Sequence, residues 1–293
     1  MEVTFKNYSN KYGFNNDFFK VFQFFKDFGA KGMNENWHWG RWEWLIGHPY
    51  LEKAMLPIIG VWECNDVIVA VVTHDMTLGQ AYIVCNPKFK YLEPEMLNYA
   101  QNNLSLNGML KIATNDVDFE LLELLKRENF CKSGHTEVLL SLNCANRLLE
   151  YSLPEGYTVS CFAENNDLNK HERVIWKGFN HEGLPPLIDE TQVIFRPHFN
   201  PSLTVFIVAP DGEYASHCGM WYDPGMEQAY IEPVVTIPEH RKLGLGKAAI
   251  YECVNRCSTM GAKSAQVISD QQFYYSIGFE KSSVYTFWEK KII

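Results

Sequence analysis

The sequence predicts an α/β (α+β) protein made of two tandem domains with the same fold, residues 1–150 and 151–293. Three observations lead to this prediction. The chain has 293 residues, enough for two domains of about 150 residues each. Residues 228–261 pass from a β-branched segment through a glycine-bearing turn into a helical pattern. The first half also repeats part of the second half in the same order, at an offset of about 150 residues.

Composition indicates a globular protein that works in water. Hydrophobic residues make up 46% of the chain and charged residues 21%, which is an ordinary globular mixture. No stretch approaches the roughly 18 consecutive apolar residues of a membrane-spanning helix, and the N-terminus lacks the features of a signal peptide. We therefore expect a cytoplasmic location and no membrane partner.

The charge balance and the cysteines narrow the classes of partner. A net charge of −9 argues against a nucleic-acid partner and is compatible with a cationic substrate. The 8 cysteines are scattered, without a CxxC pair. Cys253 and Cys257 are four residues apart on a predicted helix, but no His or Cys cluster lies near them in the sequence. We expect buried reduced thiols and no metal site.

The junction between strand and helix in the second half has clear local signals. Residues 228–236 are rich in β-branched and apolar side chains and predict a strand. Pro233 predicts a bulge, a bend or an edge position within that strand, and Pro238 helps to end it. From Leu245 onward the apolar residues recur at helical spacing, and Gly261 is a plausible C-terminal stop.

The start of this helix has the chemistry of an anion site. Amide N–H groups in the first helical turn have no partner inside the helix, and the helix dipole adds partial positive charge there. Gly244 and Gly246 would let phosphate oxygens approach these amides, and Arg241 and Lys242 would supply countercharge. The spacing fits neither a Walker nor a Rossmann motif. From local physics alone, a flexible helix entry beside a solvated basic pair remains an equal alternative.

Two motifs in this half resemble those of the GNAT superfamily of N-acetyltransferases. The resemblance extends from about residue 155 to 293. The first motif consists of Val235, Pro238, Arg241, Gly244 and Gly246. The second, about thirty residues later, is "FYYSIGF" at 273–279, in which Tyr274 stands four residues before Gly278.

The resemblance implies that each domain is a mixed, mostly antiparallel twisted sheet flanked by helices. It implies a first strand at 157–162, followed by a helical region at 167–183 that forms one wall of the acceptor site. A hairpin turned at Asp211 and Gly212, the strand 228–236 and the cofactor helix would follow. The remaining elements would be a strand at 263–269, a short helix at 270–278 capped by Ser269 or Asp270, and closing strands at 279–291.

The resemblance also implies acetyl-CoA as co-substrate. Backbone groups of Val234, Val235 and Thr236 would pair with the pantetheine arm as an added strand does. The pyrophosphate would be held by the amides of Lys242, Leu243, Gly244, Leu245, Gly246 and Lys247. Tyr274 would protonate the departing thiolate, because a phenol with a pKa of roughly 10 is protonated at neutral pH. Packing is the alternative role of Tyr274.

The sequence does not single out one residue as the general base. Glu232 stands where members of the family often place a glutamate. The resemblance implies that it would accept the proton of the amine directly, act through water, or bind the cationic amine. A structural role beside Pro233 is the alternative. His181, His217 and His240 are further titratable candidates, although surface or packed positions are the commoner roles. The family often has an Asn before the tyrosine of the closing helix, and here only Ser269 or Asp270 stands near that place.

The first half resembles a copy of the second that has lost its site. Pro87 matches Pro238, Lys90 falls on Arg241 and Phe130 falls on Phe279. Glu93 and Glu95 then replace Gly244 and Gly246, and Leu125 replaces Tyr274. Carboxylates suit a helix start but repel a pyrophosphate. We expect the first domain to support the second and to wall part of the acceptor pocket.

A tryptophan-rich segment in the first half has two interpretations. Trp37, Trp39, Trp42 and Trp44 lie within eight residues, close to Arg41. Large amphipathic rings bury well at a domain interface, and they also build aromatic pockets for cations or sugars. We favour the interface, with ligand contact as the alternative.

The leading hypothesis is an N-acetyltransferase that uses acetyl-CoA and a small, cationic primary amine. One alternative is a CoA-binding sensor or structural protein without useful catalysis. Others are an enzyme that acts on protein or peptide amines, and a first domain that binds a different ligand in its tryptophan-rich segment. A homodimer is compatible with the sequence.

Overall fold

The structure is a computed structural model that describes residues 2–9, 12–29, 32–48, 51–185 and 196–292. It divides into two compact units. Unit 1 comprises residues 1–139, 268–270 and 281–293, and unit 2 comprises residues 140–267 and 271–280. The division therefore differs from a single boundary after residue 150, because the chain returns to unit 1 at its end.

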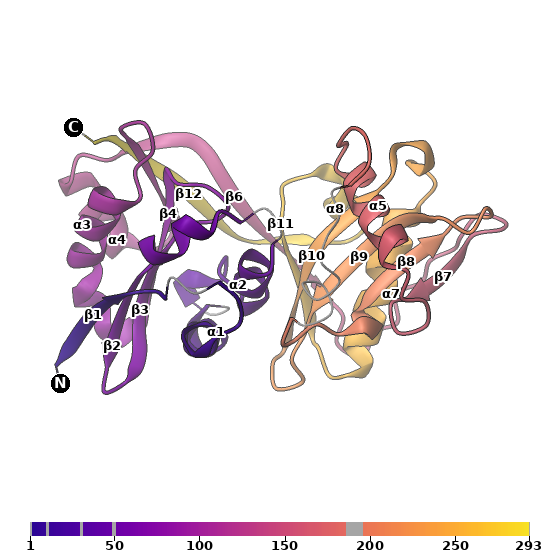
Figure 1. The fold of residues 1–293 in the computed structure, drawn as a ribbon, viewed down its shortest axis with the longest axis horizontal. Coiled ribbons are helices and arrows are strands. Elements are labelled where there is room, and N and C mark those ends of the chain that lie inside the picture. Colours follow the sequence, from indigo (N-terminus) through magenta and orange to yellow (C-terminus); the bar gives the residue numbers. More distant parts are fainter. Residues whose placement is uncertain (1, 10–11, 30–31, 49–50, 186–195, 293) are drawn as a thin grey trace. The chain divides into compact units, whose positions relative to one another are not determined.

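Unit 1 has a sheet in the order β1-β2-β3-β4-β5-β12-β6. The pair β4–β5 is parallel, whereas β1–β2, β2–β3, β3–β4 and β5–β12 are antiparallel. Helices α3 and α4 pack on one face of this sheet. Its elements (Figure 1) are β1 Val3–Asn7, α1 Asn16–Phe28, η1 Gly32–Asn34, α2 Trp39–Ile46, η2 Lys53–Ile58, β2 Gly60–Cys64, β3 Val67–Thr73, β4 Gln80–Cys85, η3 Pro87–Leu92, α3 Glu93–Asn103, β5 Met109–Asn115, α4 Phe119–Arg127, the first part of β6 Cys131–Asn143, and β12 Glu280–Lys291.

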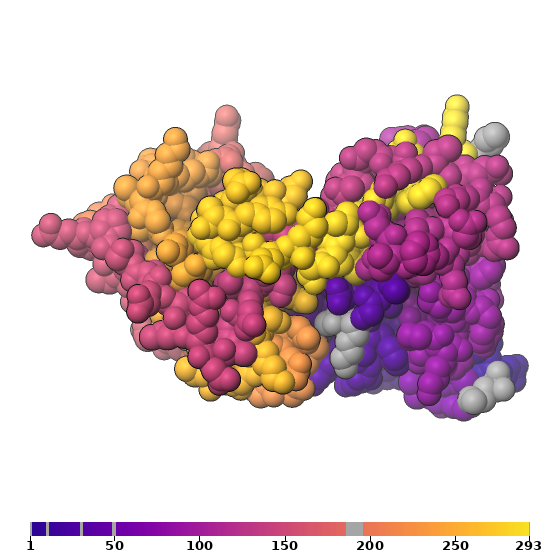
Figure 2. Space-filling view, turned by 180° about the vertical axis from the view of Figure 1, so that it is seen from behind, coloured from indigo at the N-terminus to yellow at the C-terminus, as the bar shows by residue number. Residues whose placement is uncertain are grey.

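The last strand completes the sheet of unit 1. The sequence placed residues 279–291 as closing strands of the second domain, but β12 pairs with β5 instead, from Tyr285 opposite Asn115 to Lys291 opposite Met109. Tyr285 and Phe287 are buried in this position. Figure 2 shows the yellow C-terminal residues against the magenta surface of unit 1. Strand pairing over such a sequence distance leaves no local signal.

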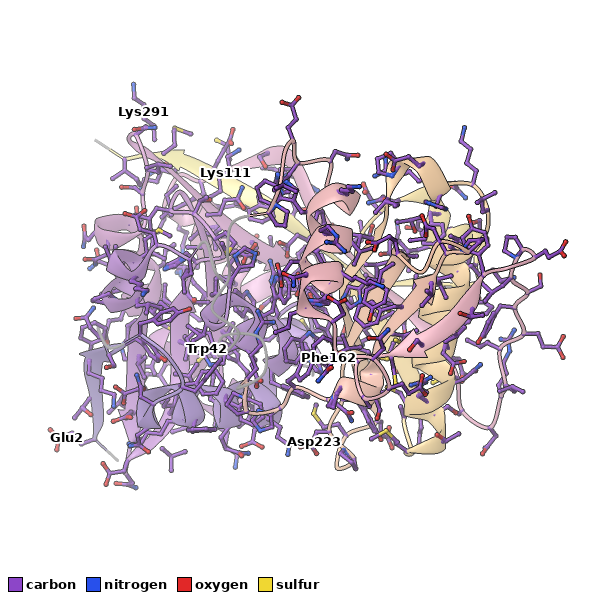
Figure 3. The ribbon with its side chains drawn as sticks, turned by 45° about the vertical axis from the view of Figure 1, so that its right-hand side comes forward. Glu2, Trp42, Lys111, Phe162, Asp223 and Lys291 are labelled. Carbon is purple, nitrogen blue, oxygen red and sulfur yellow. The ribbon has the colours of Figure 1, made fainter. Side chains whose placement is uncertain are left out.

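The tryptophan-rich segment forms part of the core of unit 1. Trp37, Trp39 and Trp42 are fully buried. Trp42 stacks on Phe18, at 6.1 Å between ring centroids, and Figure 3 shows it among the side chains of this unit. Arg41 lies 4.9 Å from the centre of the Trp37 ring, so the cation beside these aromatic rings is the protein's own.

Unit 2 repeats the element order of unit 1. Its sheet runs β6-β11-β10-β9-β8-β7, starting from the second part of β6. Its other elements (Figure 1) are β7 Thr158–Cys161, α5 Leu168–Gly178, η4 Pro201–Leu203, β8 Thr204–Val208, β9 Tyr214–Trp221, β10 Gln228–Thr236, η5 Pro238–His240, α7 Leu245–Thr259, β11 Ser264–Ile268 and α8 Gln272–Ser276.

Helices α5 and α7 cover opposite faces of the sheet of unit 2. On β9, the ring of His217 faces His171 of α5, at 5.2 Å between centroids. Its neighbour Cys218 accepts a bond through its carbonyl from Cys253 of α7. Adjacent residues of a strand point to opposite faces, so the two helices lie on different sides. Cys253 and Cys257 are buried free thiols, as predicted.

The internal repeat is visible in matching local geometry. Pro87 and Pro238 each begin a 3-10 helix that leads toward a longer helix. The Phe130 amide donates to Leu125 O, and the Phe279 amide donates to Tyr274 O, five residues earlier in both cases. These equivalent contacts show that the residues matched in the sequence occupy matching places in the two units.

Most local predictions in unit 2 are confirmed. Strand β10 covers 228–236 and its register shifts between Ile231 and Val234, around Pro233. The β8–β9 hairpin turns at Gly212, with a φ of 84°, and α7 begins at Leu245. The predicted cap of α8 is wrong, because the residue before this helix is Gln271, which makes no side-chain cap bond.

Candidate active site

The turn between β10 and α7 is exposed, and two of its residues have a left-handed backbone conformation. Lys242 has a φ of 65° and Gly244 a φ of 79°. Gly244 is the N-cap of α7 and makes no side-chain cap bond. A Cβ at Gly244 would meet no atom within 4 Å, so the space beside Gly244, at the start of the 15-residue helix, is open. This is the geometry of an anion site.

Gly246 has a packing role that the sequence did not reveal. A Cβ there would lie 3.3 Å from both Phe273 Cζ and Thr236 Oγ1. The missing side chain therefore lets α7 approach α8 and the end of β10 closely. The two glycines thus act differently: one leaves the turn open, and the other closes the packing behind it.

The guanidinium of the exposed residue Arg241 makes three hydrogen bonds to the protein. Its Nε donates to Thr236 O at 3.0 Å, and its Nη2 donates to Gly178 O and to Asn180 Oδ1, both at 2.9 Å. These bonds tie the turn to the end of β10 and to the last residue of α5. Arg241 therefore fixes the turn, and Lys242 beside it is also exposed.

Strand β10 leaves part of one edge open. It pairs with β11 only at 228–230 but with β9 as far as Thr236. The Ile237 amide donates to Ala215 O of β9, and successive residues face opposite edges of a strand. The backbone groups of Val235 therefore face β9, whereas those of Val234 and Thr236 face the edge that β11 has left. Thr236 O already accepts from Arg241.

Tyr274 lies on α8 and is only 8% exposed. Burial raises the pKa of its phenol well above its usual value, and the nearby ionisable groups Cys218 and Glu232 raise that pKa further. The hydroxyl therefore stays protonated throughout the physiological pH range, as a proton donor must. Tyr275, its neighbour, is partly exposed.

Glu232 lies on β10 next to the bulge. Trp221 Nε1 donates to its backbone carbonyl at 2.9 Å, and a Cβ at Gly219 would come within 2.7 Å of the same oxygen. The charge of Glu232 adds to the rise in the pKa of the Tyr274 phenol, so Glu232 acts electrostatically on the residue that the sequence put forward as the proton donor.

The three histidine candidates have other surroundings. His217 is buried, its Nδ1 lies 3.1 Å from Val205 O, and burial followed by the nearby His171 lowers its pKa well below the usual value. His240 Nδ1 lies 2.6 Å from Tyr157 Oη. His181 is exposed and its ring lies 4.4 Å from that of Trp176. His217 is therefore neutral and packed in the core.

Two hydroxyl residues that brace the elements of the site have little signal in the sequence. Ser216 Oγ donates to Val235 O at 2.8 Å and lies 2.9 Å from Thr236 Oγ1. Tyr251 Oη donates to Ile277 O at 2.7 Å. A polar residue in the buried strand β9 was the only available signal for the first, and the second sits within an apolar helical pattern that concealed it.

In unit 1, charged side chains occupy the turn that matches the β10–α7 turn of unit 2. Lys90 Nζ lies 2.8 Å from Asp118, 3.1 Å from Glu120 and 3.8 Å from Glu93. Glu93 is 6% exposed. Trp62 Nε1 donates to Glu95 at 2.8 Å. The carboxylates that replace the two glycines are thus part of the structure of this unit.

Comparison with known proteins identifies the fold. Residues 166–279 match the model of the acetyltransferase (GNAT) family. A search of curated proteins found no match. Among solved structures, the chain is similar to a GCN5-related N-acetyltransferase from Sphaerobacter thermophilus, with a TM-score of 0.58 and 15% identity over 99% of this chain and 96% of that one.

Two further solved structures are similar over nearly the whole chain. A tandem GNAT protein from the clavulanic acid biosynthesis pathway has a TM-score of 0.58 and 12% identity, covering 100% of this chain and 99% of its own. N-myristoyltransferase from Saccharomyces cerevisiae has a TM-score of 0.56 and 11% identity, covering 99% and 80%. At such identities the shared feature is the fold.

Proposed function

We propose, from the premise that residues 166–279 are a domain of the acetyltransferase (GNAT) family, that unit 2 transfers an acetyl group from acetyl-CoA to a primary amine. The observation that carries this proposal is the open turn at Gly244, the N-cap of α7. An acyl-CoA is the donor that the GNAT fold implies, and acetyl is the acyl group that we infer.

The turn and the neighbouring strand edge suit the two polar parts of the carrier. The amides from Lys242 to Lys247 would hold the pyrophosphate, helped by the charges of these two lysines. The pantetheine arm would lie along β10 and bond to the backbone of Val234 and to the Thr236 amide, in the manner of an added strand. Arg241 would contribute by holding the turn in shape.

We infer that Tyr274 and Glu232 carry the proton transfers of this reaction. The acceptor nitrogen attacks the thioester carbonyl, the C–S bond breaks, and the departing thiolate takes a proton from the Tyr274 hydroxyl. Before the attack the ammonium gives one proton to Glu232, either directly or through water, and the second proton that the nitrogen loses as the amide forms restores the Tyr274 phenol. The raised pKa of Tyr274 favours a donor over a base in this scheme.

The acceptor that we infer is a small cationic amine. The negative charge of Glu232 would attract an ammonium to the reacting centre, and the net charge of −9 would favour the approach of cations in general. Protein and peptide amines are the competing class. Activity on peptides alone, with no small amine accepted, would contradict this part of the proposal.

Turnover by the purified full chain tests the proposal. The chain is incubated with acetyl-CoA and a panel of polyamines, aminoglycosides, amino-acid derivatives and peptides, and the release of free thiol is followed. We expect thiol release that depends on the amine, together with an acetylated product of matching mass. Absence of CoA binding in calorimetry would remove the basis of the proposal.

The deep burial of Tyr274 favours one alternative, a unit that binds CoA without catalysis. Changing Tyr274→Phe separates the two functions. An enzyme that uses this hydroxyl should lose roughly 10²–10⁴-fold in kcat while its affinity for acetyl-CoA is retained. A wild-type chain that binds acetyl-CoA but acetylates no amine, and whose affinity is unchanged in the variant, would instead identify a binding protein.

A further inference from the structure

Helix α8 carries Tyr274 but is too short to hold its own position. It spans five residues, and its N-cap residue Gln271 makes no side-chain cap bond. Isolated helices shorter than about 12 residues are marginal in water. The direction of the Tyr274 hydroxyl therefore depends on contacts that other elements make with α8 and with the turn that follows it.

Tyr251 of α7 supplies such a contact. Its hydroxyl donates to Ile277 O at 2.7 Å, and the residue is 8% exposed. Ile277 is the C-cap of α8, and its amide donates to Tyr274 O at 3.2 Å. A single turn of chain thus connects the oxygen that Tyr251 holds with the backbone of Tyr274.

The same tyrosine also lies beside the proposed pyrophosphate turn. Lys247 Nζ is 5.0 Å from the centre of the Tyr251 ring, and Lys247 is in the first turn of α7. Tyr251 therefore stands between the end of α7 that would hold the carrier and the helix that would protonate its sulfur. A buried hydrogen bond at this point aligns the two ends of the site.

The first unit provides an internal comparison. The offset that matches Pro87 with Pro238 also matches Ala100 with Tyr251. Helix α4, the counterpart of α8, has nine residues and is capped by Asp118, whose side chain accepts from the Leu121 amide. The unit that has Leu125 in place of Tyr274 thus also has no hydroxyl at the Tyr251 position, and its helix is stable by other means.

We propose that Tyr251 is a positioning residue for the acid Tyr274, and this inference rests on the proposed function of unit 2. The hydroxyl of Tyr251 fixes the end of α8 against α7, so that the Tyr274 phenol points toward the sulfur of the bound carrier. Tyr251 itself touches neither reacting atom.

The variant Tyr251→Phe tests this role in the full chain. It removes one hydroxyl and keeps the ring that packs in unit 2. We expect kcat to fall roughly 10-fold to 100-fold, as small misplacements of catalytic groups do, with little change in the Kd for acetyl-CoA. The matched control is Tyr222→Phe, because Tyr222 Oη donates to Met260 O at the opposite end of α7, at 3.3 Å. The control should keep the wild-type kcat.

A double variant distinguishes positioning from general destabilisation. In the Tyr274→Phe background, Tyr251→Phe should have almost no further effect on kcat, because the group that it positions is absent. Equal losses in both backgrounds, an unchanged kcat in Tyr251→Phe, or an equal loss in Tyr222→Phe would each overturn the inference. A wild-type chain that turns over no amine would instead overturn the proposed function, so the two failures are distinguishable.

Discussion

At the scale of single residues, Glu93 is the clearest pH-sensitive group in unit 1. Burial raises the pKa of its carboxyl to about 7, against the opposing charge of Lys90, and Asp118 and Glu120 add to the rise. Burial also raises the pKa of the adjacent Cys85 thiol to about 12. The folded state thus holds a proton on Glu93 that the unfolded state releases near pH 4.5.

This difference predicts how the stability of unit 1 varies with pH. Between about pH 4.5 and 7 the native state binds more protons than the unfolded state, so the free energy of unfolding falls as pH rises, by up to about 3 kcal/mol. The variant Glu93→Gln should lack this slope. Denaturant unfolding at several pH values, followed by tryptophan fluorescence, measures it.

The exposed Glu123 on α4 provides the control for that measurement. Glu123→Gln should keep the wild-type slope, because this carboxyl pairs with Lys126 at the surface. A Glu93→Gln chain with the same pH dependence as the wild type would contradict the assignment of the slope to Glu93.

The residues of the candidate site are predictable from the sequence, whereas the contacts that their side chains make are not. Gly244 is predicted from the chemistry of the helix start, and the resemblance to the GNAT family puts forward Tyr274 and Glu232, because a backbone or reactive group at a set position leaves a sequence signal. The direction of the Arg241 side chain toward Gly178 O had no such signal. It depends on where α5 ends in space, and Gly178 lies 63 residues away in the chain.

At the scale of elements, the packing of α5 on β10 depends on Gly178. A Cβ at this position would overlap the side chain of Val235. The variant Gly178→Ala should therefore destabilise unit 2 by about 3 kcal/mol, and it should disturb Val235 next to the proposed pantetheine edge. Thermal or denaturant unfolding measures the loss. Gly134→Ala, where a Cβ meets no atom within 4 Å, should be nearly neutral; equal effects would contradict this account.

Element boundaries in unit 2 were predictable where a proline or a glycine interrupts the strand or helix pattern. Pro233, Pro238 and Gly244 mark the bulge, the end of β10 and the start of α7 through their restricted or permissive backbones. The cap of α8 was not predictable, because Ser269 and Asp270 are both good capping residues and the strand β11 ends close to them. There the Ser269 amide donates to Val138 O, and tertiary contacts decided where the helix begins.

At the scale of the whole molecule, the stability of unit 1 depends on the C-terminal strand β12, because this strand pairs with β5. Removing residues 281–293 would expose the edge of β5 and take away the buried Tyr285 and Phe287. The burial lost is on the order of 5 kcal/mol. We expect this truncation to make unit 1 sensitive to proteolysis while unit 2 stays protected.

Rescue of the truncated chain provides the second arm of that test. A synthetic peptide of residues 280–293, added in trans, should restore protection of unit 1 by pairing with β5. Full protection of unit 1 without the peptide, or earlier cleavage of unit 2, would contradict the proposed dependence. The sequence repeat predicted two similar units. It did not predict that the C-terminal strand belongs to the sheet of unit 1, because the strand pattern of 280–291 fits the edge of either sheet.

Calorimetric titration with acetyl-CoA tests most directly the central claim, that the open turn of unit 2 holds the pyrophosphate and the filled turn of unit 1 does not. We expect one binding site per chain. Gly244→Glu, which places there the residue found at the matching position in unit 1, should weaken binding at least tenfold, whereas Gly134→Glu adds the same charge on β6 and should leave it unchanged. Two sites per chain, no binding, or full affinity in Gly244→Glu would contradict the account.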